Sequence, residues 1–178
     1  MASTDATAST AFRKWGVFLI AFVVVVLDQI SKHLVRTNFT IGQSMPESGI
    51  FRLTYYTNTG AAFSILPDRT TLFIIVAFVA IAIIVFYSRR LPGERILVRT
   101  GLGLQLGGAI GNLTDRLVHG QVTDFIDISI WPVFNIADTA VFTGVGLLAY
   151  FLLIQTPKPV EPVRPAGSEP QREPQREA

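Results

Sequence analysis

The sequence contains no cysteine, and charged residues make up only 16% of its 178 residues. Without cysteine the chain can form no disulfide bond, no thiolate metal site and no cysteine nucleophile. A soluble domain has about 25% charged residues, so this composition excludes a chain that is mostly one large soluble domain. The formal net charge is only +2, and we expect no nucleic-acid partner.

The chain is dominated by long apolar runs. Hydrophobic residues make up 49% of it, and its mean hydropathy is +0.44. Each run has roughly 17 to 22 residues, enough for a helix to cross a hydrocarbon core about 30 Å thick. We therefore predict an integral membrane, mainly α-helical fold with four transmembrane helices: Trp15 to Leu34, Thr71 to Tyr87, Ile96 to Leu117 and Ile136 to Ile154.

The two ends of the chain differ from this core. Residues 1–14 are rich in Ser, Thr and Ala, and residues 157–178 are rich in Pro, Glu and Arg; both compositions predict disordered tails around one membrane domain at 15–156. The first apolar run follows two basic residues, as in a secretory signal peptide. No small-x-small cleavage site follows it, so we expect it to remain as the first helix.

Basic residues predict the orientation. They precede the first span and surround the short loop between the second and third spans, and such residues concentrate on the cytoplasmic side. Both termini should therefore be cytoplasmic, whereas residues 37–69 and 119–135 should lie outside. The basic residues are Arg13, Lys14, Arg89, Arg90, Arg95 and Arg99.

The outer loop between the first two spans contains a strand pattern. Residues 50–56 alternate Phe51, Leu53 and Tyr55 with polar or amphipathic residues, and turn signals stand on both sides. A period of two predicts a half-buried strand. We expect a small extracytoplasmic β-sheet at the membrane surface.

The third span carries glycines at every fourth position, with polar residues at its outer end. A stripe of small residues allows close helix packing in lipid. Polar residues beside it either lead to a functional site or only join helices. The stripe is Gly103, Gly107 and Gly111, and the polar residues are Asn112, Asp115 and Arg116.

Two aspartates border the segment between the last two spans. Asp124 follows the third span, and Asp138 lies in the first turn of the fourth. Carboxylates near hydrocarbon are rare unless they are paired, solvated or functional. Two carboxylates sharing a proton can hydrolyse a peptide bond, one as base on a water and one as donor to the carbonyl oxygen. This pair is the best-placed dyad, with Asp127 as a competitor or a solvated turn residue.

Two sets of polar residues also have simpler, structural interpretations. Asp138 is also suited to the positive end of a helix dipole, and Asn135 to the N-cap position. Asp28 and Lys32 lie four residues apart on one helical face. They form either a structural ion pair or part of an active site, and the sequence leaves both interpretations open.

Five short stretches stand out along the chain: DQISK at 28–32, NTGAAF at 58–63, GGAIGNLTDR at 107–116, VTDFI at 122–126 and FNIAD at 134–138. In order and spacing they resemble the motif blocks of bacterial lipoprotein signal peptidase, or signal peptidase II. The resemblance covers all four predicted spans and neither tail.

This resemblance implies an aspartyl endopeptidase of the bacterial cytoplasmic (inner) membrane. It would cleave diacylglyceryl-modified prolipoproteins just before the lipidated cysteine, in contact with membrane lipids, as a monomer and without metal or cofactor. The catalytic positions would be Asp124 and Asp138, with Asn58, Asn112 and Arg116 around the substrate. Supporting positions would be Asp28, Lys32, Gly60, Asp115 and Asn135.

Two other function classes fit the sequence less well. A small proton-coupled transporter could use Asp28, Asp115 and Asp138 as relay carboxylates, but it predicts internal repeats and broken helices, which the sequence lacks. An assembly factor, whose polar residues only join helices, leaves Asp124 unexplained.

Overall fold

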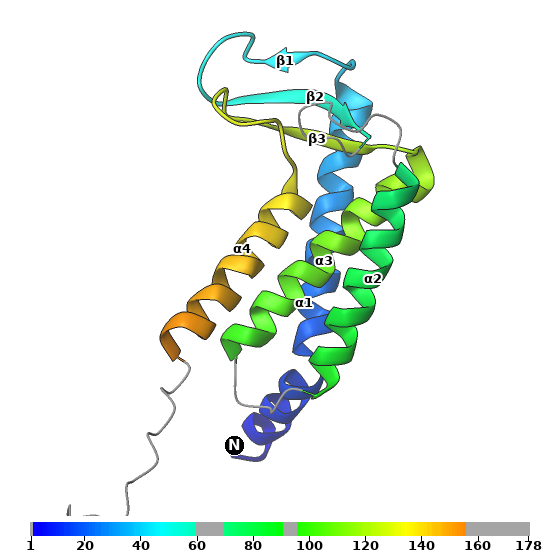
Figure 1. Cartoon of the computed structure of the whole chain (residues 1–178). Helices are drawn as coiled ribbons and strands as arrows, with labels where there is room; N and C mark the ends of the chain where they lie inside the picture. The colour runs from blue at the N-terminus through cyan, green and yellow to red at the C-terminus, as the bar shows by residue number, and fades with distance from the viewer. Residues whose placement is uncertain (1, 60–69, 91–95, 156–178) are drawn as a thin grey trace, which may run out of the picture.

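The computed structural model of the chain describes residues 2–59, 70–90 and 96–155. Its helices stand side by side as a bundle, and a small sheet lies across one end (Figure 1). In chain order the elements are α1 (Ala2–Asn38), β1 (Ser44–Met45), β2 (Arg52–Asn58), α2 (Thr70–Arg90), α3 (Ile96–His119), β3 (Val122–Asp127) and α4 (Ile136–Tyr150), which a π-helical turn (Phe151–Gln155) continues.

Three helices of the described part of the chain are long and apolar enough to cross a membrane: Trp15–Asn38, Thr70–Arg90 and Ile136–Ile154. The fourth predicted span, α3, is not among them. It has the length, but glycines and polar residues lower its mean hydropathy. Its role as a fourth span therefore stays a prediction.

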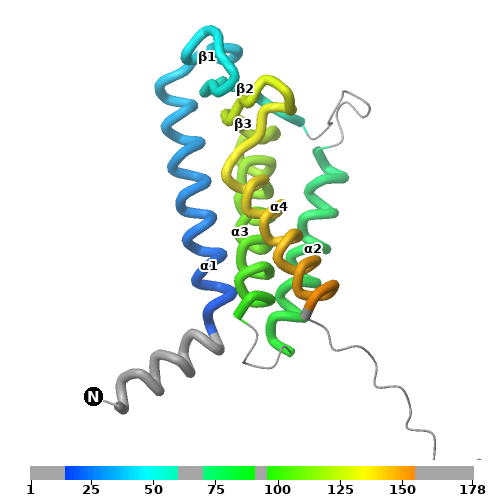
Figure 2. Tube along the Cα trace, turned by 90° about the vertical axis from the view of Figure 1, so that its left-hand side faces the viewer, coloured from blue at the N-terminus to red at the C-terminus, as the bar shows by residue number. Residues whose placement is uncertain are grey.

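Helix α3 lies inside the bundle, in contact with α1, α2 and α4 (Figure 2). The glycine stripe explains the close approach of α1. A methyl group added at Gly107 would lie 2.6 Å from Cβ of Val24, and one added at Gly103 would lie 2.8 Å from Cβ of Ile20. The predicted close packing is confirmed, because side chains at these positions would push the helices apart.

Helix α1 is longer than the apolar run that predicted it. Its helical backbone begins at Ala2 and ends at Asn38. Residues 2–14 are therefore helical in the structure, where their composition predicts a disordered tail. The C-terminal segment 157–178 lies outside the described residues.

The sheet has three antiparallel strands in the order β1-β2-β3. The loop between the first two spans supplies only β1 and β2. The third strand, β3, comes from the segment after α3, which the sequence analysis treated only as a connection between the last two spans. That assignment was wrong, since residues 122–127 pair along β2 and place Asp124 opposite Tyr56.

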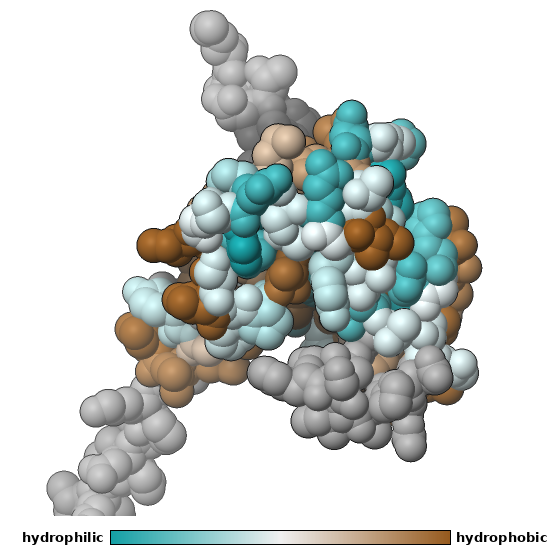
Figure 3. All heavy atoms as spheres, turned by 90° about the horizontal axis from the view of Figure 1, so that it is seen from above, coloured by the Kyte–Doolittle hydropathy of each residue, from teal (hydrophilic) through white to brown (hydrophobic). Residues whose placement is uncertain are grey.

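The sheet exposes apolar side chains at and beside β2, whereas β3 buries Val122 and Phe125 together with polar residues. Phe51 is 64% exposed and Leu53 is 41% exposed, whereas Thr54 is only 8% exposed. Seen from above, the sheet end shows hydrophobic residues among hydrophilic ones (Figure 3). Exposed apolar residues at the end of an apolar bundle are typical of a surface that contacts a membrane.

Candidate active site

The polar residues that the sequence singled out are linked by hydrogen bonds and ion pairs, and they belong to elements that meet where the sheet crosses the end of the bundle (Figure 1). They come from five elements: Asp28 and Lys32 from α1, Asn58 from β2, Asn112, Asp115 and Arg116 from α3, Asp124 from β3, and Asn135 and Asp138 from the start of α4. Of the predicted site residues, Gly60 lies outside the described residues.

Asp124 is almost completely buried, with 1% of its surface exposed. Its Oδ1 accepts a hydrogen bond of 2.6 Å from the side-chain amide of Asn135. Its Oδ2 accepts one of 3.3 Å from the side-chain amide of Asn58. Asn58 is the last residue of β2, and its side-chain amide points at Asp124. Its local sequence favours a turn instead.

Asp138 lies in the first turn of α4 and is partly exposed. Its Oδ1 accepts a hydrogen bond of 2.7 Å from the Asn112 amide. Its Oδ2 has a long contact of 3.4 Å with the backbone N–H of Asn135. One carboxylate oxygen is thus firmly held, and the other is only weakly bonded.

Asn135 connects the two aspartates. It is fully buried at the N-cap of α4, and its Oδ1 accepts the backbone N–H of Asp138 at 2.9 Å. Its amide nitrogen donates to Asp124. Sequence reasoning identified the cap but missed this second role, because nothing local in the sequence indicates that β3 lies beside the cap.

The pKa of Asp124 is raised to about 7, first by burial and second by the negative charge of Asp138. The hydrogen bonds from Asn135 and Asn58 and the charge of Lys32 act the other way, because they stabilise the ionised form. The two carboxylates therefore interact electrostatically, and a large fraction of Asp124 is still protonated near neutral pH.

Arg116 stands on the α2 side of this group. Its Nη1 makes a long contact of 3.4 Å with the backbone oxygen of Asn112, and its guanidinium carbon lies 5.2 Å from the ring centre of Phe73 in α2. Its charge interacts favourably with Asp124 and Asp138. Arg116 therefore adds positive charge beside two carboxylates.

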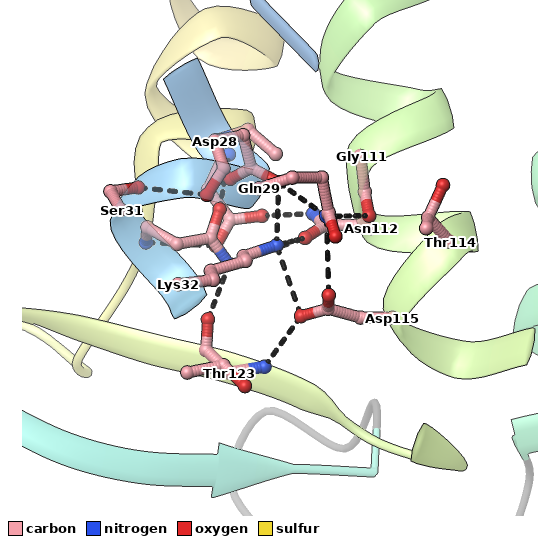
Figure 4. A network of polar contacts seen from close by, with 12 residues as sticks. Asp28, Gln29, Ser31, Lys32, Gly111, Asn112, Thr114, Asp115 and Thr123 are labelled. Atoms are coloured by element: carbon pink, nitrogen blue, oxygen red, sulfur yellow. Dashed lines mark hydrogen bonds and ion pairs between the residues drawn. The ribbon is translucent and has the colours of Figure 1, made fainter. Parts of the chain in front are cut away.

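A second polar cluster lies next to these residues, between α1 and α3 (Figure 4). Lys32 Nζ lies 2.9 Å from Asp28 Oδ2 and 3.2 Å from Asp115 Oδ2, and all three side chains are fully buried. The sequence left open whether Asp28 and Lys32 are only an ion pair. In the structure Lys32 also donates to Asn112 Oδ1 at 2.9 Å, so the cluster directly contacts a partner of Asp138.

Sequence reasoning missed two further members of this cluster. Gln29 donates to Asp28 and Asp115, and Arg36 donates to Thr123 and contacts Asp115 at 3.4 Å. Arg36 could have been found, since it continues the four-residue spacing of Asp28 and Lys32 along one helical face.

Asp127 has a separate environment. Its Oδ2 pairs with Arg52 at 2.7 Å and accepts from Thr54, and its Oδ1 accepts the backbone N–H of Ser129 at 2.8 Å. The Ser129 hydrogen bond is the main cause that lowers its pKa. Asp127 is therefore buried and connects β2 to the end of β3. It is neither a member of the dyad nor a solvated turn residue, the two interpretations that the sequence left open.

An apolar pocket opens beside Asp138, with a volume of about 500 Å³. It lies between α4 and the segment that joins β3 to α4, and its lining is Ile128, Trp131, Phe134, Asp138, Thr139 and Phe142. One carboxylate in a largely apolar lining can act on a polar bond of a molecule that is otherwise hydrophobic.

Among the described residues, no group of three or more His, Cys, Asp or Glu side chains is placed to hold a metal ion.

Comparison with known proteins gives consistent results. Residues 20–154 match a family model described as signal peptidase (SPase) II. The chain is 48% identical over 137 residues to the lipoprotein signal peptidase of Moorella thermoacetica, across 76% of this chain and 91% of that protein. It is 40% identical over 146 residues to the lipoprotein signal peptidase of Bacillus subtilis, across 79% of this chain and 95% of that one.

Solved structures show the same similarity. A bacterial membrane enzyme determined at 1.9 Å resolution superposes with a TM-score of 0.72 and 34% identity, across 79% of this chain and 94% of that one. Another, determined at 2.3 Å, gives a TM-score of 0.71 and 32% identity, across 82% of this chain and 94% of that one. The helical bundle with its terminal sheet is therefore shared with enzymes of bacterial membranes.

Proposed function

The chain belongs to the signal peptidase II family, and from this membership we propose that it is a membrane aspartyl endopeptidase. Its substrates are diacylglyceryl-modified prolipoproteins, and it cleaves just before the lipidated cysteine. The observation that carries the aspartyl mechanism is the electrostatic interaction between Asp124 and Asp138, with the proton held on buried Asp124 near neutral pH. Such a pair supplies one acid and one base at the same place.

The hydrogen bonds support a division of roles. Asn112 donates to Asp138 Oδ1, which leaves Oδ2 to accept a proton from water. Protonated Asp124 then donates a hydrogen bond to the scissile carbonyl oxygen as the water attacks. When the tetrahedral intermediate collapses, the proton gained by Asp138 passes to the leaving amine.

The surroundings of Asp138 suit a lipid-modified peptide. The apolar pocket lies next to its carboxylate and can receive hydrophobic parts of a substrate that diffuses in the bilayer. Asn58, Asn112 and Arg116 offer amide and guanidinium donors for the peptide backbone. The enzyme works as a monomer in contact with membrane lipids, and needs no metal or cofactor.

In the membrane, residues 15–156 form the peptidase domain, with α3 as the fourth span. Helix α3 can cross lipid despite its glycines and polar residues, because it contacts all three other helices. The basic residues before the first span and around the loop between the second and third spans support a topology with both termini in the cytoplasm and with the sheet and dyad outside.

The test is cleavage of a diacylglyceryl-modified prolipoprotein by the purified protein in detergent. Asp124→Asn and Asp138→Asn keep the side-chain shape and remove the acid. Each should lower kcat by about 10²- to 10⁴-fold while the protein stays folded. Asp127→Asn, in the same segment, is the matched control and should still cleave.

Cleavage by both folded dyad variants at the wild-type rate would refute the aspartyl mechanism. If the wild-type protein never cleaves a modified substrate but cleaves an unmodified one, the proposed substrate is wrong.

A further inference from the structure

The residue before each proposed catalytic aspartate is held by a buried carboxylate. The backbone N–H of Thr123 donates to Asp115 Oδ2 at 2.9 Å, and the backbone N–H of Ala137 donates to Asp28 Oδ1 at 2.9 Å. The two carboxylates come from different helices. They hold β3 and the first turn of α4 at the points where the dyad side chains begin.

Lys32 joins these two carboxylates. Its Nζ lies 2.9 Å from Asp28 Oδ2 and 3.2 Å from Asp115 Oδ2 (Figure 4). An unbroken chain of polar contacts therefore runs from the backbone before Asp124, through Asp115, Lys32 and Asp28, to the backbone before Asp138.

The third donor of Lys32 orients Asn112. An ammonium group has three N–H donors, and the third partner of Lys32 is Asn112 Oδ1 at 2.9 Å. Since the amide oxygen of Asn112 accepts from Lys32, its nitrogen must face Asp138, to which it donates at 2.7 Å. The Asn135 amide donates to the same oxygen at 3.2 Å, so Lys32 supplies the shorter of the two hydrogen bonds that keep the Asn112 nitrogen toward Asp138. Without the lysine, only the longer hydrogen bond from Asn135 would oppose a turn of this amide.

A purely structural ion pair does not require this arrangement. Burying charges costs several kcal/mol for each ion, and apolar residues often hold helices together as well or better. The contacts here are all directed at groups bonded to the dyad or to its neighbouring backbone, which suggests a functional reason for the buried charge.

On the basis of the proposed function, we propose that Lys32 is a positioning residue of the dyad: it sets the spacing of Asp124 and Asp138 through two carboxylates, and it keeps the Asn112 amide turned toward Asp138. It touches neither substrate nor the reacting atoms. Its positive charge also interacts electrostatically with Asp124.

The charged groups that face the dyad come from three helices. They are Asp28, Lys32 and Arg36 from α1, Asp115 and Arg116 from α3, and the dyad partner Asp138 from α4. Tyr56 of β2 stands opposite Asp124 in the sheet. Among these groups, the charge of Lys32 favours ionisation of Asp124, so its loss should move the titration of the dyad to higher pH.

The test compares Lys32→Met, Asp115→Asn and the double variant with wild type, using kcat, KM and the pH dependence of cleavage. Lys32→Met removes a positive charge, Asp115→Asn removes a negative one, and the double variant keeps the wild-type net charge. Ser31→Ala is the matched control on the same helix, because within the described part of the chain the Ser31 hydroxyl donates to the backbone oxygen of Asp28 and to none of the charged side chains. Thermal unfolding in detergent checks that each protein is folded.

We expect kcat to fall by about 10²-fold in all three variants, as for small displacements of catalytic groups, with KM little changed. The pH profile should move up by about one unit in Lys32→Met and down in Asp115→Asn. It should return close to the wild-type position in the double variant, although kcat stays low. Ser31→Ala should match wild type.

Two results would overturn the inference. The first is folded variants whose pH profiles stay at the wild-type position, which is what a structural role predicts. The second is wild-type kcat in the double variant. If Lys32→Met does not fold, Asp115→Asn and the double variant still decide between these outcomes. Asp124→Asn, assayed in parallel, tests the dyad itself, so a failure of the dyad is distinguishable from a failure of the lysine inference.

Discussion

The side-chain amide of Asn135 donates a hydrogen bond of 2.6 Å to the carboxylate of Asp124. The donor is the N-cap of α4 and the acceptor belongs to β3, so one side chain joins the two elements that carry the proposed dyad. The oxygen of the same amide caps the helix by accepting the Asp138 N–H. Helix capping and dyad orientation are therefore combined in a single residue.

The two roles of Asn135 can be separated by substitution. Serine caps a helix about as well as asparagine, whereas alanine loses the cap and costs about 1 kcal/mol. We expect both Asn135→Ser and Asn135→Ala to lower kcat by about 10²-fold, because neither can donate the amide to Asp124. Only the alanine variant should also lose the capping free energy. Wild-type cleavage by Asn135→Ser would show that the amide contact is unimportant.

The pH dependence of cleavage should follow the proton of Asp124. Because burial and Asp138 raise the pKa of Asp124 to about 7, its carboxyl stays protonated below that pH and ionises above it. The mechanism needs this proton, so kcat/KM should decline as pH rises above about 7. A pH series on the purified protein measures this limb. Constant kcat/KM up to about pH 9 would contradict the assignment of the proton.

Asp127 should affect stability more than catalysis. Its carboxylate is held by Arg52, Thr54 and the Ser129 N–H, and Asp127→Asn should lower the unfolding free energy by about 1 to 3 kcal/mol. The hydrogen bond from Ser129 lowers the pKa of Asp127. Its stabilisation is therefore present above the ordinary carboxyl pKa and is lost as pH falls through the lowered value.

Thermal unfolding at pH 7 and at pH 3 measures this contribution. The difference between wild type and Asp127→Asn should shrink at the lower pH. An equal difference at both pH values would mean that ionisation of Asp127 contributes nothing to stability.

Glycine packing predicts a contrast along the bundle. A methyl group at Gly107 would lie 2.6 Å from Cβ of Val24 and 2.8 Å from the backbone oxygen of Ala21, whereas one at Gly146 meets nothing within 4 Å. Gly107→Ala should therefore push α3 away from α1 and cost about 1 to 3 kcal/mol. Gly146→Ala should be neutral or slightly stabilising, since alanine favours helix. Thermal unfolding in detergent compares the two, and equal stabilities would contradict the packing.

Local patterns predicted the helices well. The third and fourth apolar runs begin at Ile96 and Ile136, where α3 and α4 begin. Hydropathy and helix length are properties of consecutive residues, so one stretch of sequence suffices to predict a span. The same logic placed a strand near residues 50–56, and β2 runs from Arg52 to Asn58.

The errors concern partners that are distant in sequence. Strand β3 was missed because its formation depends on pairing with β2, and strand preference depends strongly on context. Asp127 was interpreted as a possible solvated turn residue because its ion-pair partner, Arg52, lies on a strand far away in the chain and could not be recognised from the local sequence. Arg36 was missed although its spacing from Lys32 was visible.

The sequence by itself determined the class of protein, since apolar runs of membrane length and five motif stretches in order are local features. It also pointed to Asp124 and Asp138. Only the tertiary structure decided how these two are held: by Asn135 between them, and by Lys32 through Asp28 and Asp115. The physical reason is that hydrogen bonds and buried charges depend on distances between side chains from different elements, which are set only when α1, α3, β3 and α4 pack together.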